Sequence, residues 1–203
     1  MYRRFFKRPV DIFFSLLAVV VFCWLYILVA LLVRFKLGSP VIFKQARPGK
    51  DEKIFYLYKF RTMTNETDEN GNLLPDDVRL TPFGKFLRST SLDELPEAFN
   101  ILKGDMSIIG PRPQLVRDMV FMTDEQRKRH TVKPGLSGLA QVKGRNGISW
   151  EQKLAYDLEY IKDITFIGDV KIILRTVKKV LVKEGIKSET SATMEVFTGT
   201  ETN

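Results

Sequence analysis

The sequence predicts an α+β chain that is mostly helical, in which an N-terminal hydrophobic membrane helix precedes a small globular domain with a short β-hairpin and amphipathic surface helices. Three observations predict this class. Residues 12–33 form an apolar run without a charged side chain, two short aromatic-rich runs typical of strands follow it, and the last third of the chain has helical periodicity. We expect a membrane-anchoring helix at 1–37, a globular domain at 38–186 and a polar tail at 187–203.

The composition limits the possible chemistry. With 203 residues, of which 44% are hydrophobic, the chain can form one domain and an accessory segment. Cys23 and His130 are the only residues of their types, so the sequence indicates neither a disulfide framework nor a zinc or His-built metal site. Any catalysis would then depend on carboxylates, hydroxyls, lysines and arginines. The net charge of +8 predicts an anionic partner, which could be nucleic acid, lipid headgroups or a phosphorylated substrate.

The apolar run is about as long as the roughly 20 residues that cross a hydrocarbon core. It is longer than the core of a cleavable signal peptide and no small-residue cleavage pattern follows it, so we expect it to be retained. Cations flank it on both sides: Arg3, Arg4, Lys7 and Arg8 before it, and Arg34, Lys36, Lys44 and Arg47 after it. Since positive residues prefer the cytoplasmic face, a helix that enters that leaflet, bends and returns keeps both clusters there. A re-entrant helix is therefore favoured over a spanning one.

The first half of the globular domain shows, in order, the patterns of a β-hairpin, an exposed polar loop and two helices, at 41–60, 64–77, 80–88 and 91–102. The hairpin would pair 41–43 with 53–60 across a loop at 47–50. The second helix would open with a capping box, in which Ser91 and Glu94 satisfy free backbone N–H groups of the first turn.

The second half of the domain shows a short apolar run that ends in Gly-Pro-Arg-Pro, a basic helical stretch, a glycine-rich basic stretch and two helices, at 106–113, 123–129, 133–146, 148–162 and 169–183. The last helix carries an apolar stripe, which includes Val170, Leu174 and Val177, opposite its cations. Such a helix could lie on a membrane surface or pack against the domain. The tail beyond Lys187 is rich in Thr, Ser and Glu, and we expect it to be poorly ordered.

Asp93 and Glu94 are the candidate catalytic pair. Alone they are a weak signal, because acidic residues stabilise the first turn of many helices. Five cations stand at turns or element ends where their side chains could converge on a phosphate: Lys59, Arg61, Arg88, Arg112 and Arg145. Asp169 is a candidate site-supporting carboxylate, with a helix N-cap as its structural alternative.

The motifs LDELP, KFRTM, GDMSIIGPRP and KPGLSGLAQVKGRN resemble those of the bacterial sugar transferase family, also called monotopic phosphoglycosyl transferases. The resemblance covers about residues 1–183. It is strongest to the small single-domain members, such as those that initiate bacterial N-linked protein glycosylation. Several separate motifs in the right order make a chance match improbable.

The resemblance implies a catalytic domain that faces the cytoplasm at the bacterial inner membrane, with anionic phospholipids around it. A UDP-sugar would donate its sugar 1-phosphate to polyprenol phosphate and release UMP. Asp93 matches the family's nucleophile, which forms a covalent phosphosugar intermediate. Glu94 matches the second acid, expected with Asp93 to assist Mg²⁺ binding or proton handling. Arg112 is the first choice for a phosphate ligand. The sequence indicates neither the sugar, the glycan pathway nor an oligomeric state.

One departure from the family pattern concerns the anchor. Members carry a Ser-Pro pair in mid-segment, and here Cys23-Trp24 takes its place. Without the helix-breaking proline, a spanning helix becomes an alternative to re-entry. Two other functions are alternatives: a membrane-tethered basic module that binds nucleic acid, and an inactive scaffold. The first is disfavoured because no recognisable nucleic-acid motif is present, and the second because the acidic pair and its arginines are intact.

Overall fold

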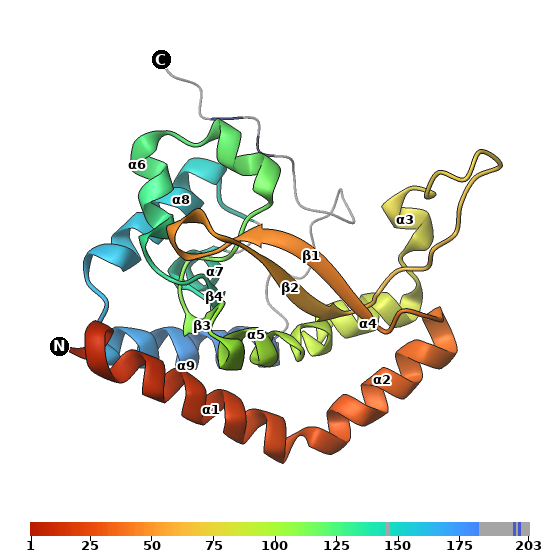
Figure 1. Ribbon diagram of the computed structural model, residues 1–203, viewed down its shortest axis with the longest axis horizontal. Coiled ribbons are helices and arrows are strands. Elements are labelled where there is room, and N and C mark those ends of the chain that lie inside the picture. The colour runs from red at the N-terminus through yellow and green to blue at the C-terminus, as the bar shows by residue number, and fades with distance from the viewer. Residues whose placement is uncertain (145–146, 183–196, 198, 200–203) are drawn as a thin grey trace.

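The computed structural model describes residues 1–144, 147–182, 197 and 199. Two helices that meet at an angle form the base of the molecule, and a domain of helices and two small sheets lies above them (Figure 1). A one-turn π-helix, η1 (Tyr2–Phe6), leads into the base helices α1 (Lys7–Val21) and α2 (Cys23–Leu37). The prediction of a mostly helical α+β chain with a β-hairpin is confirmed.

The break between the base helices lies at Phe22, and the two arms are bent by 65°. Phe22 leaves the helical region at φ −101° and ψ 16°, although neither proline nor glycine is present there to break the helix. Both arms are instead fixed by contacts with the domain above. Asp11 of α1 accepts hydrogen bonds from Ser107 Oγ at 2.8 Å and from the Ile108 N–H at 3.0 Å. We infer that these tertiary contacts, rather than a local sequence signal, hold the bend.

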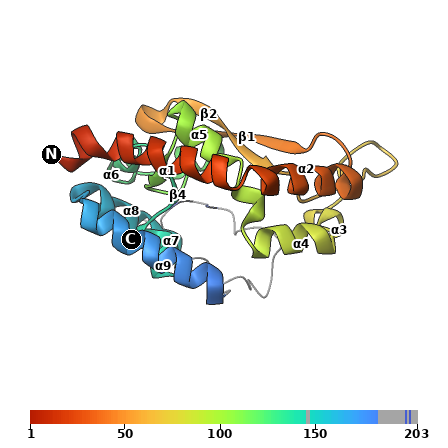
Figure 2. The same ribbon diagram turned by 90° about the horizontal axis from the view of Figure 1, so that it is seen from below.

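The second arm contributes to the core. Val29 and Val33 of α2 are buried against Phe60 and Leu87 of the domain. The opposite face of the pair is apolar and exposed, with side chains that include Phe13, Val20, Trp24 and Ile27 (Figure 2 views the pair from below). No helix among the described residues is by itself both long and apolar enough to cross a membrane, whereas the bent pair together has the required length and composition.

The predicted hairpin is present as β1 (Ile42–Pro48) and β2 (Ile54–Phe60), paired antiparallel from Ile42↔Phe60 to Pro48↔Ile54. The loop prediction at 47–50 was partly wrong, because Arg47 and Pro48 belong to β1 and the 3₁₀ turn η2 covers Lys50–Glu52. Pro48 fits at the end of an edge strand, where no backbone N–H is needed. Phe55 and Leu57 of β2 pack on Ile101 and Met106, which ties the hairpin to α5 (Glu97–Lys103).

The polar loop is followed by α3 (Asp76–Arg79) and α4 (Pro82–Ser89), the latter capped by Thr81 Oγ1, which accepts from the Gly84 N–H. The predicted helix at 91–102 is divided into the 3₁₀ turn η3 (Leu92–Glu94) and α5. The capping box was wrong: Ser91 is left-handed at φ 56° and its side chain makes no cap bond. Pro96 stands between the two pieces, and its missing N–H favours a new helix start there.

The second half of the domain contains the parallel pair β3 (Ser107–Ile109) and β4 (Gly135–Ser137). Glycine is required at this crossing, because a Cβ on Gly135 would stand 2.1 Å from the Gly110 nitrogen. Short turns connect the two strands: η4 (Val116–Phe121), α6 (Asp124–Arg127) and η5 (Lys128–Thr131). The chain continues through α7 (Leu139–Lys143), α8 (Trp150–Lys162) and α9 (Phe166–Val182).

Helix α9 runs beside α1 (Figures 1 and 2) and begins three residues before its predicted start. Its predicted apolar stripe is largely exposed at Ile173, Leu174 and Val177, so this stripe is not packed into the core. The expectation of a poorly ordered tail beyond Lys187 falls outside the described residues, except at Phe197 and Gly199. Phe197 is buried against Trp150.

Candidate active site

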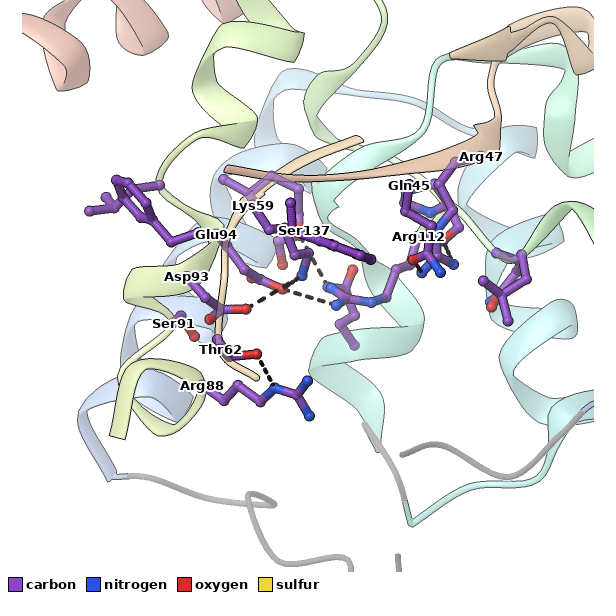
Figure 3. Close-up of a pocket in the computed structure, with 18 of the residues that line it drawn as sticks. Gln45, Arg47, Lys59, Thr62, Arg88, Ser91, Asp93, Glu94, Arg112 and Ser137 are labelled. Carbon is purple, nitrogen blue, oxygen red and sulfur yellow. Dashed lines mark hydrogen bonds and ion pairs between the residues drawn. The ribbon is translucent and has the colours of Figure 1, made fainter. Parts of the chain in front are cut away.

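Lys59 stands at the centre of a group of three carboxylates, of which Figure 3 labels Asp93 and Glu94. Its Nζ lies 2.7 Å from Glu94 Oε1, 3.2 Å from Glu97 Oε1 and 3.8 Å from Asp93 Oδ2. Arg112 Nη2 lies 2.9 Å from the same oxygen of Glu94. Two cations thus share one carboxylate oxygen, while Asp93 keeps a looser contact with Lys59.

Four chain segments bring these side chains together. Lys59 comes from β2, the adjacent acids from η3, and Glu97 from the first turn of α5. The left-handed residue Ser91 turns the chain after α4, so that Asp93 and Glu94 face the hairpin. Arg112 lies in the Gly-Pro-Arg-Pro loop after β3, where proline on each side limits the backbone.

Arg88 of α4 lies below Asp93 in the view of Figure 3, and its guanidinium points to the same side as that of Arg112. Its Nε donates to Thr62 Oγ1 at 3.0 Å. Burial lowers the pKa of Arg88, and the negative charge of Asp93 opposes that effect. Asp93 therefore experiences the positive charges of Lys59, Arg88 and Arg112.

Arg47 extends the cationic row beyond Arg112, beside Gln45 (Figure 3). Its Nη1 donates to the Pro113 carbonyl at 3.0 Å and its Nη2 to Gln45 Oε1 at 2.6 Å, while the buried Nε has no hydrogen-bond partner among the described residues. Burial, followed by the nearby charge of Arg112, lowers the pKa of Arg47 to about 10. An anion at this point would supply both a partner and a compensating charge.

These groups line one broad cleft of about 2050 Å³. The cleft extends from Arg88 past Asp93 to Arg47, and the hydroxyl of Ser137 and several apolar side chains complete its lining. Its size and its row of cations suit an extended ligand that carries phosphate groups.

The three acids differ in pKa because their surroundings differ. Burial raises the pKa of Asp93 to about 6, with Lys59 opposing and Glu94 adding to the shift. Burial and then the charge of Glu94 raise the pKa of Glu97 to about 7. Burial alone would raise the pKa of Glu94 as well, but Lys59 and Arg112 outweigh it and hold that pKa below its ordinary range. Glu94 is thus a fixed anion, whereas Asp93 is a more basic carboxylate than usual.

Comparison with known proteins identifies the family. The model of the family described as bacterial sugar transferase matches residues 2–183. The chain belongs to the bacterial sugar transferase family. The family prediction made from the motifs is confirmed, and with it the prediction of an enzyme.

Several named relatives are similar to this sugar transferase. The uncharacterized sugar transferase EpsL of Bacillus subtilis (strain 168) is 55% identical over 167 residues, which cover 82% of this chain and 83% of EpsL. The galactosyl transferase CpsE of Streptococcus agalactiae serotype III is 41% identical over 164 residues, which cover 74% of this chain and 36% of CpsE. The UDP-glucose:undecaprenyl-phosphate glucose-1-phosphate transferase of Klebsiella pneumoniae is also 41% identical, over 184 residues, which cover 86% of this chain and 40% of that protein. The alignment thus spans most of EpsL but less than half the length of the other two.

The predicted site residues of the sugar transferase do not all lie at the cleft centre. Lys59, Arg88 and Arg112 surround the acidic pair. Arg61 borders the cleft, but its guanidinium donates to the carbonyls of Ser39 and Met63 and braces the backbone. Arg145 lies outside the described residues.

Asp169 does not line the cleft that holds the acidic pair, and it is not the N-cap of α9, since the helix begins at Phe166. It accepts hydrogen bonds from Tyr160 at 2.8 Å and Tyr2 at 2.9 Å, and it pairs with Lys7 at 2.5 Å. Its observed contacts attach the N-terminal segment to α9.

Sequence reasoning missed four contributors to the site. Arg47 was predicted only as one of the cations that follow the apolar run. Glu97 follows Glu94 by three residues, a spacing that could have indicated a shared face. Arg129 and Asp157 carried no such signal. Arg129 is buried, bonded to Asp157 Oδ2 from Nε at 2.9 Å and from Nη2 at 2.6 Å, and Nη2 also donates to the Arg112 carbonyl at 2.6 Å. This buried pair supports the loop that presents Arg112.

Proposed function

We propose that the chain transfers a sugar 1-phosphate from a UDP-sugar to polyprenol phosphate, giving a polyprenyl-diphospho-sugar and UMP. The observation that carries this proposal is the placement of Asp93, a carboxylate of raised pKa, beside Lys59, Arg88 and Arg112 in one cleft. The name of the Klebsiella relative, a UDP-glucose:undecaprenyl-phosphate glucose-1-phosphate transferase, supports the donor and acceptor classes.

In the first step, an Asp93 carboxylate oxygen attacks the phosphorus that bears the sugar. A new carboxyl–phosphate bond forms as the bond between that phosphorus and the UMP oxygen breaks, and UMP leaves with the electron pair. In the second step, a phosphate oxygen of the polyprenol phosphate attacks the same phosphorus. The bond to Asp93 then breaks, and the free carboxylate is restored.

The cations make the approach of two anions possible. An ionised Asp93 would be repelled by a diphosphate, and the positive charges of Arg88, Lys59 and Arg112 counter that repulsion. Arg112 is the best placed to hold phosphate, because it is the more exposed member of the pair that binds Glu94. Arg47, whose Nε has no partner, extends this contact toward the leaving group.

Asp93 and Glu94 suit one Mg²⁺ ion. Among the described residues, no three histidine, cysteine or carboxylate side chains form a complete metal site. Mg²⁺ is commonly held by one or two carboxylates, with substrate phosphates and water as its other ligands, and both acids line the cleft. When bound there, the ion would neutralise the diphosphate and the departing UMP.

We further propose that the bent pair is re-entrant at the bacterial inner membrane, with the catalytic domain in the cytoplasm among anionic phospholipids. Both arms contact the same domain, α1 through Asp11 and α2 through Val33, which favours both ends lying on one side. The apolar face around the bend would enter the lipid. The absence of the family's proline is compatible with this topology, because contacts at the two arms can hold the bend.

The decisive assay measures UMP release from UDP-sugars with polyprenol phosphate and Mg²⁺, using the full chain in detergent. Asp93→Asn should abolish release and the covalent phosphosugar adduct, whereas Asp124→Asn, a matched change at an exposed site, should retain both. No release with any common UDP-sugar, or full activity in Asp93→Asn, would refute the proposal. The same donor screen would identify the sugar. It is needed because two relatives that are both 41% identical to this chain carry different sugars in their names, galactosyl in one and glucose in the other.

Topology is tested separately. Single cysteines introduced as Arg4→Cys or Lys36→Cys, in a Cys23→Ser background, report the two ends of the bent pair. Re-entry predicts that an impermeant thiol reagent added outside intact cells labels neither position, and that both react in inverted vesicles. Labelling from opposite sides would show a spanning segment instead.

A further inference from the structure

A second cavity, of about 170 Å³, lies at the N-terminal end of α1, and Ile109 of β3 borders both this cavity and the catalytic cleft. Its lining is strongly cationic. Five lysine and arginine side chains contribute to it: Arg3, Lys7, Arg8, Lys50 and Lys133. Asp11 is its one acidic lining residue among the residues that the structure describes.

Internal contacts neutralise only part of this charge. Lys7 is paired with Asp169, and Lys50 lies 3.8 Å from Asp51. Both oxygens of Asp11 already accept hydrogen bonds from β3. Arg8 donates to backbone carbonyls, from Nη1 to Ile101 at 2.5 Å and from Nη2 to Leu102 at 2.9 Å. Within the described part of the chain, neither Lys133 nor Arg8 forms an ion pair with a carboxylate.

The two unpaired cations converge above a glycine. Gly104 ends α5 in the left-handed conformation, at φ 101°. The position that a Cβ would take on Gly104 lies 3.3 Å from Arg8 Nη2 and 3.5 Å from Lys133 Nζ. The two cationic groups therefore lie close to one point beside Gly104, and both residues also line the second cavity.

The electrostatic environment of Lys133 agrees with this geometry. Burial lowers the pKa of Lys133, and the charges of Arg8 and Lys50 lower it further, while Asp11 and Asp105 offset only part of the effect. The repulsion between neighbouring cations is unfavourable, and a bound anion would relieve it.

The surroundings of the cavity are apolar and exposed. Phe5 and Phe6 of η1 project to solvent, as does Phe166 of α9, whose ring lies 5.6 Å from that of Tyr2. A ligand with an anionic head and an apolar body matches this combination, since its tails could lie along α1 while its head enters the cavity.

We propose that this cavity binds a phosphate group through Lys133 and Arg8, and that the phosphate belongs to the headgroup of an anionic phospholipid beside α1. The required chemistry is that of phosphate, which could also come from free phosphate in solution. The lipid as its source rests on the membrane association proposed above, whereas the phosphate site itself does not.

The test is a calorimetric titration of the full chain in detergent with three probes and no sugar donor present. The probes are soluble dihexanoyl phosphatidylglycerol, the zwitterionic phosphatidylcholine of the same chain length, and inorganic phosphate. We expect phosphatidylglycerol to bind most tightly and its affinity to fall about tenfold in Lys133→Gln, since a charge-assisted hydrogen bond is lost. Lys53→Gln, an exposed lysine of the hairpin turn that does not line the cavity, is the matched control and should bind as the wild type does.

Lys50→Gln provides a second variant at an exposed lining residue, in case Lys133→Gln fails to fold. If inorganic phosphate binds with the same dependence on Lys133 and phosphatidylglycerol does not bind, the phosphate site stands and its lipid source is overturned. If neither probe binds, or if the cavity variants and Lys53→Gln change the affinity equally, the site is refuted. Because no donor is present, either result leaves the UMP-release test of the proposed transferase unaffected.

Discussion

Replacing Asp157 by asparagine is expected to destabilise the fold by about 3 to 5 kcal/mol, the usual cost of removing one partner from a buried ion pair. The side chains of Arg129 and Asp157 are 1% and 3% exposed, so solvent cannot screen their charges. Asparagine keeps the size and shape of the side chain but not its charge. The Arg129 guanidinium would then be buried without a counter-charge.

The same change should reach the active site. Arg129 Nη2 donates to the Arg112 carbonyl as well as to Asp157. A guanidinium that shifts toward water in search of solvation would withdraw this bond from the Gly-Pro-Arg-Pro loop. We therefore expect slower UMP release from the folded Asp157→Asn variant, through misplacement of Arg112.

Urea unfolding of the full chain in detergent measures the free energy of unfolding. In thermal unfolding, we expect the Tm of Asp157→Asn to fall by about 10 °C. Asp163→Asn, an exposed residue just after α8, is the control and should leave both unchanged. The double variant Arg129→Met with Asp157→Asn removes both charges and should recover much of the lost stability. A free energy of unfolding of Asp157→Asn within about 1 kcal/mol of the wild-type value would refute the reasoning.

Three further predictions concern single side chains. Lys59→Gln should slow UMP release by about a hundredfold or more, because it removes the central counter-charge of the acidic group; Lys59→Arg should retain more activity, and equal rates for all three forms would contradict this role. Burial, with the charge of Arg129, lowers the pKa of His130 from 6.5 to about 4. Between these pH values the unfolded chain binds a proton at His130 that the folded chain does not, so His130 alone lowers the free energy of unfolding by up to about 3 kcal/mol as the pH drops from 6.5 to 4, whereas Asp93 and Glu97, with raised pKa values, act in the opposite direction. In urea unfolding, the stability of His130→Asn relative to the wild type should therefore rise as the pH falls from 6.5 to 4, and a difference that does not change with pH would contradict this effect of His130. Arg47→Gln should raise the KM for the UDP-sugar several-fold with a smaller change in kcat, measured by UMP release; an unchanged KM would argue against a contact with the donor.

The elements that could be predicted are those with strong local patterns. The hairpin and α8 follow from alternation and helical periodicity within one segment. The helix at 91–102 was misread because its capping-box pattern is local, whereas the chain is turned by a left-handed Ser91 and restarted after Pro96. A Ser-x-x-Glu pattern by itself does not distinguish a helix N-cap from a turn whose acidic side chains face a neighbouring strand.

The site could be predicted in its motif residues but not in its supports. Asp93, Glu94 and Arg112 stand in recognisable motifs, and the structure brings them together. The contacts of Arg129 with Asp157 join residues 28 positions apart, and only the tertiary fold brings them close. The bend at Phe22 was likewise hidden, because the sequence there contains no helix breaker.

The way in which the bend is held has a consequence for biosynthesis. The hydrophobic segment is synthesised before Leu87 and Ser107, which fix its arms. Until they exist, no proline or glycine near Phe22 holds the segment bent. The final shape of the anchor therefore depends on the folding of the domain that follows it, and a fragment that ends near residue 40 should adopt a straighter helix than the full chain does.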